Sequence, residues 1–379
     1  MDLTFDDETE EFRAEVRDFL AANTKHFPRV SYDLAEGFEQ HRHWDKVLFD
    51  AGLSVIAWPK EFGGRDASLL QWIVYEEEYF RAGAPGRASA NGTSMLGPTL
   101  FAHGTPEQRK RILPKMASGE EIWAQAWSEP ESGSDLASLR STATKTDGGW
   151  KLNGQKIWSS RAPFGDKAFG LFRTDPAAQR HKGLTYFMFD LHTEGITVRP
   201  IAQLGGATGF GEIFLDDVFV PDDDVIGTVD AGWAAAMSTS SNERGMSLRS
   251  PARFLAPAER LVDAWKNQEG DTKIAFADRV ADAWIKAQAY RLHTFGTVTR
   301  LAAGGELGAE SSVTKVFWSD LDVALHQTAL DLRGADAELA DTWTEGLLFA
   351  LGGPIYAGTN EIQRNIIAER LLGLPREPK

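Results

Sequence analysis

Apolar residues recur every three to four positions in the first 119 residues, and this spacing predicts helices. In the first helix, Phe12, Val16 and Leu20 form one apolar face behind an acidic start. Further on, Thr105 to Gln108 form a capping box with proline at the first helical position, which marks another helix start. From Gly232 to the C-terminus the chain returns to long helical segments.

The pattern changes near Trp123, where alternating apolar and polar residues predict strands. Residues 150–158 are interpreted as a hairpin, because Asn153-Gly154 suits the positive φ angles of a two-residue turn. Little helix separates the strands that follow, which are expected at Ala168–Arg173, Leu184–Asp190, Ile196–Pro200 and Glu212–Val220.

The chain of 379 residues is long enough for several packed units. The pattern predicts an α+β protein with an N-terminal helical domain (1–122), a central β domain (123–228) and a C-terminal helical domain (229–379).

The composition excludes several classes of protein. With 40 Lys and Arg against 55 Asp and Glu, the net charge of −15 argues against nucleic acid or an anionic membrane as partner. The chain has no cysteine, so it has no disulfide or thiolate chemistry, and this fits the cytoplasm. The acidic N-terminus does not resemble a secretory signal, and no apolar run reaches the roughly 20 residues of a membrane helix.

The chemistry is concentrated in a loop near the C-terminus, residues 352–365. Two glycines and a proline make an irregular turn, Gly358 permits a close backbone approach, and Thr359 is a suitable N-cap for the next helix. Ile362, Ile366 and Leu371 repeat at helical spacing, so this helix is expected to pack inward. A plain joint between two helices would have the same residue types.

Residues 356–365, Tyr-Ala-Gly-Thr-Asn-Glu-Ile-Gln-Arg-Asn, resemble the C-terminal signature of the acyl-CoA dehydrogenases. These flavoenzymes desaturate acyl-CoA thioesters. Many members carry a catalytic glutamate where this chain has Ala357, so the resemblance leaves Ala357 only a backbone N–H for the thioester carbonyl. The resemblance places Thr359 and Glu361 among the residues that contact FAD.

A second motif covers residues 124–135, a strand that ends in a turn rich in hydroxyl groups and glycine. Such a turn offers donors to an electron-rich ring or a phosphate, although a surface loop has a similar composition. On a following strand, alternation places Trp158 and Ser160 on one face, where a core tryptophan is the simpler interpretation. Together the segments resemble the flavin-binding strands of the family, with Ser128, Gly133, Ser134, Trp158 and Ser160 in the matching positions.

The missing base has a candidate replacement at Glu243. A polar run, residues 238–244, interrupts an otherwise apolar helix, and an exposed helix face or a capping segment would explain it equally well. However, Glu243-Arg244 falls where a minority of the family, including the isovaleryl and long-chain types, carry the catalytic glutamate and an arginine. The resemblance therefore implies Glu243 as the base and Arg244 as the adjacent cation.

Two family motifs are missing. Homotetrameric members have an Arg-x-x-Phe-Gly segment and a paired-glycine turn that reach a neighbour's FAD, and residues 265–270 and 332–336 match neither. The same departures occur in a bacterial subgroup of two-chain complexes that act on steroid or other bulky side-chain CoA esters. We therefore expect an α₂β₂ hetero-oligomer with a homologous subunit, with a homotetramer as the alternative.

The resemblance implies FAD-dependent α,β-desaturation of an acyl-CoA in lipid or steroid β-oxidation. An electron-transfer flavoprotein or another acceptor would reoxidise the flavin. It also implies a central β-barrel or β-sandwich and a C-terminal four-helix bundle, with FAD between these two domains. Two alternatives stay open: a relative of the flavin monooxygenases or nitroalkane oxidases, and a non-catalytic subunit that supports FAD in a heteromeric dehydrogenase.

Two other patterns are rejected as sites. Residues 205–211 are rich in glycine, but a strand follows them, so no helix N-terminus is available for a dinucleotide phosphate. His41, His43 and Asp45 lie on a predicted helix at a spacing that does not stack two metal ligands. We interpret these three residues as part of a solvated surface.

Overall fold

The protein is represented by a computed structural model that describes residues 4–27, 30–244 and 250–376. Two compact units divide the chain. The helical unit comprises residues up to Lys25, Ser68–Ala84 and the chain from Arg244 onward, and the sheet unit comprises His26–Ala67 and Pro85–Glu243.

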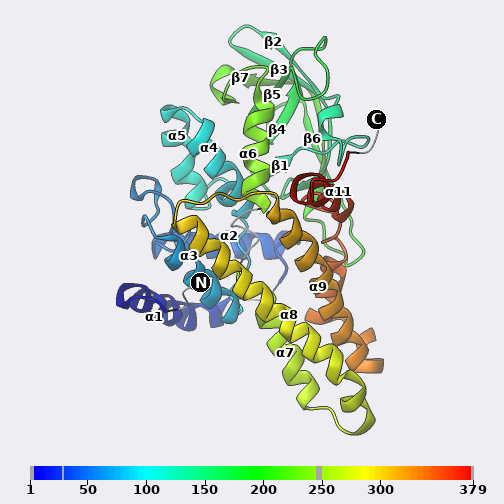
Figure 1. Ribbon diagram of the computed structural model, residues 1–379. Coiled ribbons are helices and arrows are strands. Elements are labelled where there is room, and N and C mark those ends of the chain that lie inside the picture. Colours follow the sequence, from blue (N-terminus) through cyan, green and yellow to red (C-terminus); the bar gives the residue numbers. More distant parts are fainter. Residues whose placement is uncertain (1–3, 28–29, 245–249, 377–379) are drawn as a thin grey trace. The chain divides into compact units, whose positions relative to one another are not determined.

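The helical unit contains α1 (Asp7–Asn23), α3 (Leu69–Arg81), α7 (Leu255–Lys266), α8 (Gly270–Ala302), α9 (Glu310–Arg333), α10 (Thr342–Ala350) and α11 (Asn360–Ile366). Figure 1 shows α7, α8 and α9 as long helices of this unit that run alongside one another. Aromatic residues fill their contact, among them Phe254, Tyr290 and Trp318. Burial of such large apolar side chains is the main source of stability in a helical bundle.

The predicted first helix is confirmed. Its residues Phe12, Val16 and Leu20 are buried, and the Asp6 carboxylate caps it by accepting the Thr9 N–H at 2.8 Å. The acidic first turn also suits the positive end of the helix dipole.

A buried carboxylate joins three helices of this unit. Glu77 on α3 is 3.2 Å from the Arg13 guanidinium of α1 and 2.5 Å from that of Arg291 on α8. Burial alone would raise the pKa of Glu77, but the neighbouring arginines, Arg291 foremost, more than offset this and hold it below its ordinary value. Glu77 is therefore ionised and connects the three helices by ion pairs. Loss of either arginine would leave the buried Glu77 carboxylate with less compensating positive charge.

The sheet unit contains β1 (Trp123–Ala126), β2 (Thr142–Thr146), β3 (Gly149–Ser160), β4 (Lys167–Arg173), β5 (Leu184–Asp190), β6 (Ile196–Ile201), β7 (Phe210–Pro221) and β8 (Val225–Ile226). The strand order is β6-β7-β3-β2-β4-β5-β8, and β1 pairs in parallel with β4. The four later strands expected from the sequence are confirmed as β4 to β7. The α+β class with helical, sheet and helical segments is also confirmed.

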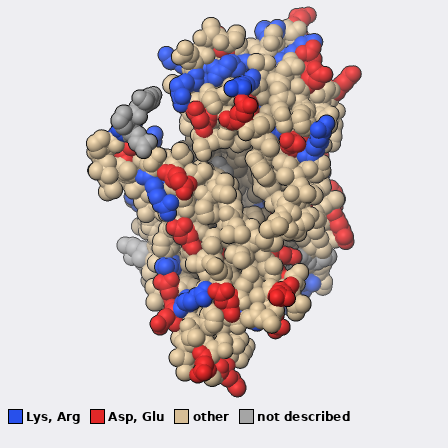
Figure 2. Space-filling model, turned by 90° about the vertical axis from the view of Figure 1, so that its right-hand side faces the viewer, with Lys and Arg blue, Asp and Glu red and all other residues tan. Residues whose placement is uncertain are grey.

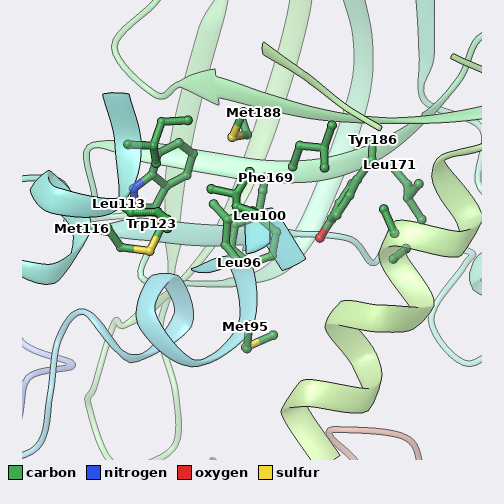
Figure 3. Packing of buried hydrophobic residues seen from close by; sticks show 14 of the residues in the cluster. Met95, Leu96, Leu100, Leu113, Met116, Trp123, Phe169, Leu171, Tyr186 and Met188 are labelled. Atoms are coloured by element: carbon green, nitrogen blue, oxygen red, sulfur yellow. The ribbon is translucent and has the colours of Figure 1, made fainter. Parts of the chain in front are cut away.

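The sheet is apolar on both faces. On β4, Phe169 and Leu171 belong to one buried cluster, whereas Ala168 and Phe172 belong to another. Figure 3 shows the first cluster, in which Phe169, Leu171 and Tyr186 lie near residues from neighbouring helices. A strand buried on both sides has a continuous apolar sequence, which is what β4 has.

The predicted turn at Asn153-Gly154 is wrong. These residues lie inside the continuous strand β3, where the pairing register with β7 shifts between Leu152 and Gly154. The turn is instead made by Asp147 and Gly148, which connect β2 to β3. Asn153 makes side-chain hydrogen bonds with Asp217 of β7. Both Asn-Gly and Asp-Gly suit a two-residue turn, and strand pairing decides between them.

The sheet unit also contains α2 (Ala35–Asp50), α4 (Gly97–His103), α5 (Pro106–Ala117) and α6 (Gly232–Arg244). The predicted capping box at Thr105 and Gln108 is confirmed at the start of α5. Residues Gly92–Leu96, directly before α4, form a π-helical turn, which is a rare conformation often found near functional sites.

The interpretation of His41 and Asp45 as solvated is wrong, because both side chains are buried, whereas His43 is exposed. The His41 ring nitrogens lie 2.6 Å from the Gly86 carbonyl oxygen and 2.9 Å from that of Val30. Asp45 accepts the Ser89 N–H at 2.8 Å. Among the described residues no cluster could hold a metal ion, and no helix is long and apolar enough to cross a membrane.

Charged groups of both signs lie on the face of the molecule shown in Figure 2, and wide areas without charge separate them. This face therefore carries basic as well as acidic side chains, although the whole chain has a negative net charge.

We expect Asp45 to make stability depend on pH. Burial raises the pKa of Asp45 to about 7, although hydrogen bonds from Ser89 and the charges of Arg87 and Arg161 act to lower it. Because the folded-state pKa lies above the ordinary value, the free energy of unfolding should fall as pH rises from about 4 to 7. Asp45→Asn removes this titration, so the wild type should lose about 2 to 4 kcal/mol relative to the variant over that range.

Urea unfolding at a series of pH values measures this difference. Asp50→Asn, on the exposed end of the same helix, is the matched control and should follow the wild type. Parallel pH curves for the wild type and Asp45→Asn would show that Asp45 does not titrate in this range.

Candidate functional site

The end of β1 is fastened to β3. The Ser128 carbonyl accepts the N–H of Ile157 at 2.8 Å, which brings Ser128 beside the residue before Trp158. The sheet unit therefore brings together two of the predicted flavin-contacting residues from segments that are 30 positions apart in sequence.

Trp158 has an unusual conformation for a strand residue. Its φ is +57°, in the left-handed region, and the register between β3 and β7 shifts between Lys156 and Ser159. A bulge therefore interrupts the regular strand before Ser159, although Ser159 is buried between the more exposed Trp158 and Ser160, as alternation predicts. The Trp158 side chain is 56% exposed and makes an edge contact with Phe210. A large aromatic residue held exposed by a costly backbone conformation suggests a ligand-binding role.

The remaining predicted residues of the sheet unit lie at the end of β3 and in the turn after β1. Ser160 ends β3, and its carbonyl accepts the side-chain N–H of Asn91 at 3.2 Å, next to the π-helical turn. Gly133 and Ser134 are exposed in the turn that precedes residues Leu136–Ser138. No atom lies within 4 Å of a Cβ built on Gly133, so this part of the turn is open.

A buried ion pair that the sequence analysis missed fixes this turn. The ammonium of Lys156 is fully buried and lies 2.8 Å from the Glu129 carboxylate and 2.8 Å from the Leu171 carbonyl. Glu129 also accepts the N–H groups of Arg140 and Ser141. Burial raises the pKa of Glu129, but Lys156 and these donors hold it below its ordinary value. The only signal in the sequence was a lysine at an inward strand position.

The helix that carries Glu243 is fastened to the same region. The indole N–H of Trp127 donates to the Tyr186 hydroxyl at 3.2 Å, and that hydroxyl is 3.3 Å from the Thr239 hydroxyl on α6. Thr239 is also 2.7 Å from the hydroxyl of Thr99. Glu243 follows Thr239 by four positions, so its Cα lies about one turn further along the same helix face.

Glu243 and Arg244 form the last turn of α6. The side chains of residues 242–249 lie outside what the structure describes. The roles predicted for Glu243 and Arg244 therefore stay predictions.

In the helical unit, the C-terminal loop also has an unusual backbone. Ala357 has φ +54° and Gly358 φ +83°, so two successive residues are left-handed. An alanine pays a steric cost in this region, and surrounding contacts must hold it there. A turn can present backbone N–H groups to an oxygen ligand.

The helix after this loop begins as predicted. The Thr359 hydroxyl caps α11 by accepting the Ile362 N–H at 3.3 Å. Glu361 is exposed in the first turn, and hydrogen bonds from its own backbone amide and from Thr359 hold its pKa below the ordinary value. Glu361 therefore places a negative charge at the positive end of the helix.

The inward packing expected of Ile362 and Leu371 is wrong, because both are exposed. The buried residues of α11 are instead the polar Asn360 and Gln363. The Lys315 ammonium on α9 is buried as well, and it donates to Asn360 Oδ1 at 2.9 Å and to the Gly353 carbonyl at 2.8 Å. This lysine therefore fixes both ends of the loop, and the sequence analysis missed it.

The residues present fit a flavin. Gln363 is fully buried, yet neither atom of its amide group has a hydrogen-bond partner within the described residues. A side chain at position 358 would place its Cβ 2.3 Å from the amide nitrogen of Gln363. The close approach of this amide to the loop backbone therefore requires glycine at that position. A flavin offers both donors and acceptors for such an amide group. In the sheet unit, taken by itself, the exposed ring of Trp158 suits the aromatic plane of a flavin.

Helical, sheet and helical segments with these two loops suit a flavin-dependent oxidoreductase. The sequence matches the acyl-CoA dehydrogenase N-terminal domain over residues 6–120, the middle domain over 124–218 and the C-terminal domain over 230–372. The chain belongs to the acyl-CoA dehydrogenase family, whose members are oxidoreductases acting on CH–CH groups.

The similar proteins include a solved steroid acyl-CoA dehydrogenase. Acyl-CoA dehydrogenase IpdE1 of Mycobacterium tuberculosis is 39% identical over 98% of this chain and 99% of its own length. The solved Tcur3481-Tcur3483 steroid acyl-CoA dehydrogenase superposes with a TM-score of 0.89 at 27% identity, covering both chains completely. The ChsE4-ChsE5 complex of M. tuberculosis gives a TM-score of 0.86 at 26% identity, again over both complete chains.

We expect Trp158 to hold the flavin ring. Trp158→Ala removes an aromatic ring whose contact with the flavin ring should contribute about 1 kcal/mol beyond the burial of apolar surface. Flavin should therefore be lost more readily, and its absorbance should shift. The flavin content and spectrum of the purified protein measure this. Phe219→Ala removes another exposed aromatic side chain of the same sheet and should change neither. A Trp158→Ala protein with an unchanged spectrum and content would assign Trp158 a packing role only.

Proposed function

We propose that the protein is an FAD-dependent acyl-CoA dehydrogenase that introduces an α,β double bond into a bulky, steroid-derived acyl-CoA. The family match supports the reaction, and the similarity to a solved steroid acyl-CoA dehydrogenase supports the substrate class. Ser128, Gly133, Ser134, Trp158, Ser160, Thr359 and Glu361 are the proposed FAD contacts.

The observation that carries this proposal is the left-handed backbone at Ala357, fixed by the Lys315 contacts on either side. In this role the Ala357 N–H donates to the thioester carbonyl. Developing negative charge on that oxygen strengthens the hydrogen bond, which lowers the barrier to removal of the α-proton. A rigid donor does this without reorganising during the reaction.

Glu243 is the proposed base. Its carboxylate takes the α-proton from the substrate, and the adjacent Arg244 supplies a positive charge near that carboxylate. When bound, FAD accepts the β-hydride at N5. The fixed geometry of Thr239 on the sheet unit supports this role, because it holds the helix that presents Glu243.

We also propose that this chain works with a homologous subunit in an α₂β₂ assembly. The two missing adenine-side motifs support this, and the ChsE4-ChsE5 neighbour is itself a complex of two different proteins. An electron-transfer flavoprotein or another carrier would reoxidise the flavin. A cytoplasmic location and the three-domain division at residues 122 and 228 also belong to this proposal.

Glu243→Gln should abolish most of the activity. The variant keeps the shape of the side chain but cannot accept the α-proton, so reduction of bound flavin by acyl-CoA should slow by roughly 10²- to 10⁴-fold. Stopped-flow bleaching of the flavin under anaerobic conditions measures this rate. Glu259→Gln, at an exposed position on α7, should leave the rate unchanged. Undiminished bleaching by Glu243→Gln would remove this residue from the mechanism.

Co-expression with a homologous partner should restore full FAD binding. Alone, the chain lacks adenine-side contacts and should carry little flavin, because charged phosphates without partners are costly to bury. The complex should contain both chains equally and be yellow. Native mass spectrometry and the ratio of flavin to protein measure both properties. A stable homotetramer with one FAD per chain and full activity would contradict this assembly.

A further inference from the structure

Arg253, in the turn before α7, is a cation enclosed by aromatic side chains. The guanidinium carbon lies 4.9 Å from the centre of the Trp318 ring and 5.0 Å from that of Phe254. Tyr356 interacts with the same guanidinium, whose side chain remains 17% exposed. The position is therefore neither a solvated surface nor a closed core.

The described residues compensate the charge of Arg253 only partly. The nearest approach to the carboxylate of Asp322 is 3.9 Å, beyond hydrogen-bond distance, and the same carboxylate is 3.1 Å from His326. Burial lowers the pKa of Arg253, but Tyr356 and Asp322 more than offset this and raise it, so the group stays charged. An arginine has five N–H donors, and among the described residues Tyr356 and Asp322 are polar groups that interact with this one.

Arg253 lies close to the proposed substrate contact. Tyr356 directly precedes Ala357 in the chain, and its ring is 5.9 Å from that of Trp318. Arg253, Tyr356 and Trp318 therefore form one group beside the loop that carries the Ala357 amide. Aromatic walls suit the carbon skeleton of an acyl group better than the phosphates of CoA.

We propose that Arg253 is a specificity-determining residue that donates hydrogen bonds to a keto oxygen on the acyl group. The inference rests on the proposed function and narrows its substrate class to bulky acyl-CoA esters that carry oxygen on their ring system. A charged donor in apolar surroundings favours a ligand that supplies an acceptor, and it disfavours a pure hydrocarbon that leaves the charge unpaired.

A pair of CoA esters tests this proposal on the complete flavin-loaded complex. We expect 3-(4-oxocyclohexyl)propanoyl-CoA to be preferred over 3-cyclohexylpropanoyl-CoA by about 10- to 100-fold in kcat/KM. Arg253→Met should abolish this preference by slowing the keto ester and leaving the cyclohexyl ester within about threefold of the wild type. Arg260→Met is the matched control, because Arg260 also lies over a tryptophan ring but on the exposed side of α7, and it should keep the preference.

Calorimetry with the two corresponding CoA thioethers, which cannot be desaturated, measures the same preference without turnover. Arg253→Lys keeps the charge but not the planar donors, so it provides a milder variant that should reduce the preference if Arg253→Met does not fold.

Three results would overturn the proposal. An equal loss for both ligands in the Arg253 variants would show that Arg253 only positions Tyr356. A wild type that desaturates the cyclohexyl ester without preferring the keto ester would refute the role of Arg253 and leave the proposed function standing. A wild type that binds neither thioether, and whose flavin is reduced neither by these esters nor by a steroid-derived acyl-CoA, would refute the proposed function, and the Arg253 proposal with it.

Discussion

Buried ammonium groups that donate to backbone carbonyls fix both candidate loops. Lys156 binds Glu129 and the Leu171 carbonyl in the sheet unit, and Lys315 binds Asn360 and the Gly353 carbonyl in the helical unit. A desolvated ammonium without acceptors is costly, so these contacts hold the two loops tightly in place. The turn after Ser128 and the loop around Ala357 both depend on this constraint.

Such anchoring allows the backbone to remain in unfavourable conformations. Trp158 and Ala357 both have positive φ angles, at +57° and +54°, although neither is glycine. Each costs free energy that the surrounding contacts must offset. In return, one places an aromatic ring on the surface and the other directs a backbone amide. Both features suit a protein that positions a flavin and a thioester while the cofactor carries the redox chemistry.

Several sequence-based expectations failed because short patterns do not reveal what packs against them. Asn153-Gly154 suits a turn, yet pairing of β3 with β7 keeps it inside a strand. Ile362 and Leu371 have helical spacing, yet the polar Asn360 and Gln363 are the buried residues of α11. Asp45 looked solvated and is buried. In each case a contact distant in sequence overrode a local preference.

The sequence by itself determined the order of helical and sheet segments, the helix caps at Thr105 and Thr359, and the two motifs that carry the family resemblance, because periodicity and capping act over a few residues. The tertiary structure alone decided the bulge at Trp158, the buried lysines and the aromatic surroundings of Arg253. Each of these depends on residues tens of positions apart, whose meeting is set by packing and by the need of buried charges for partners.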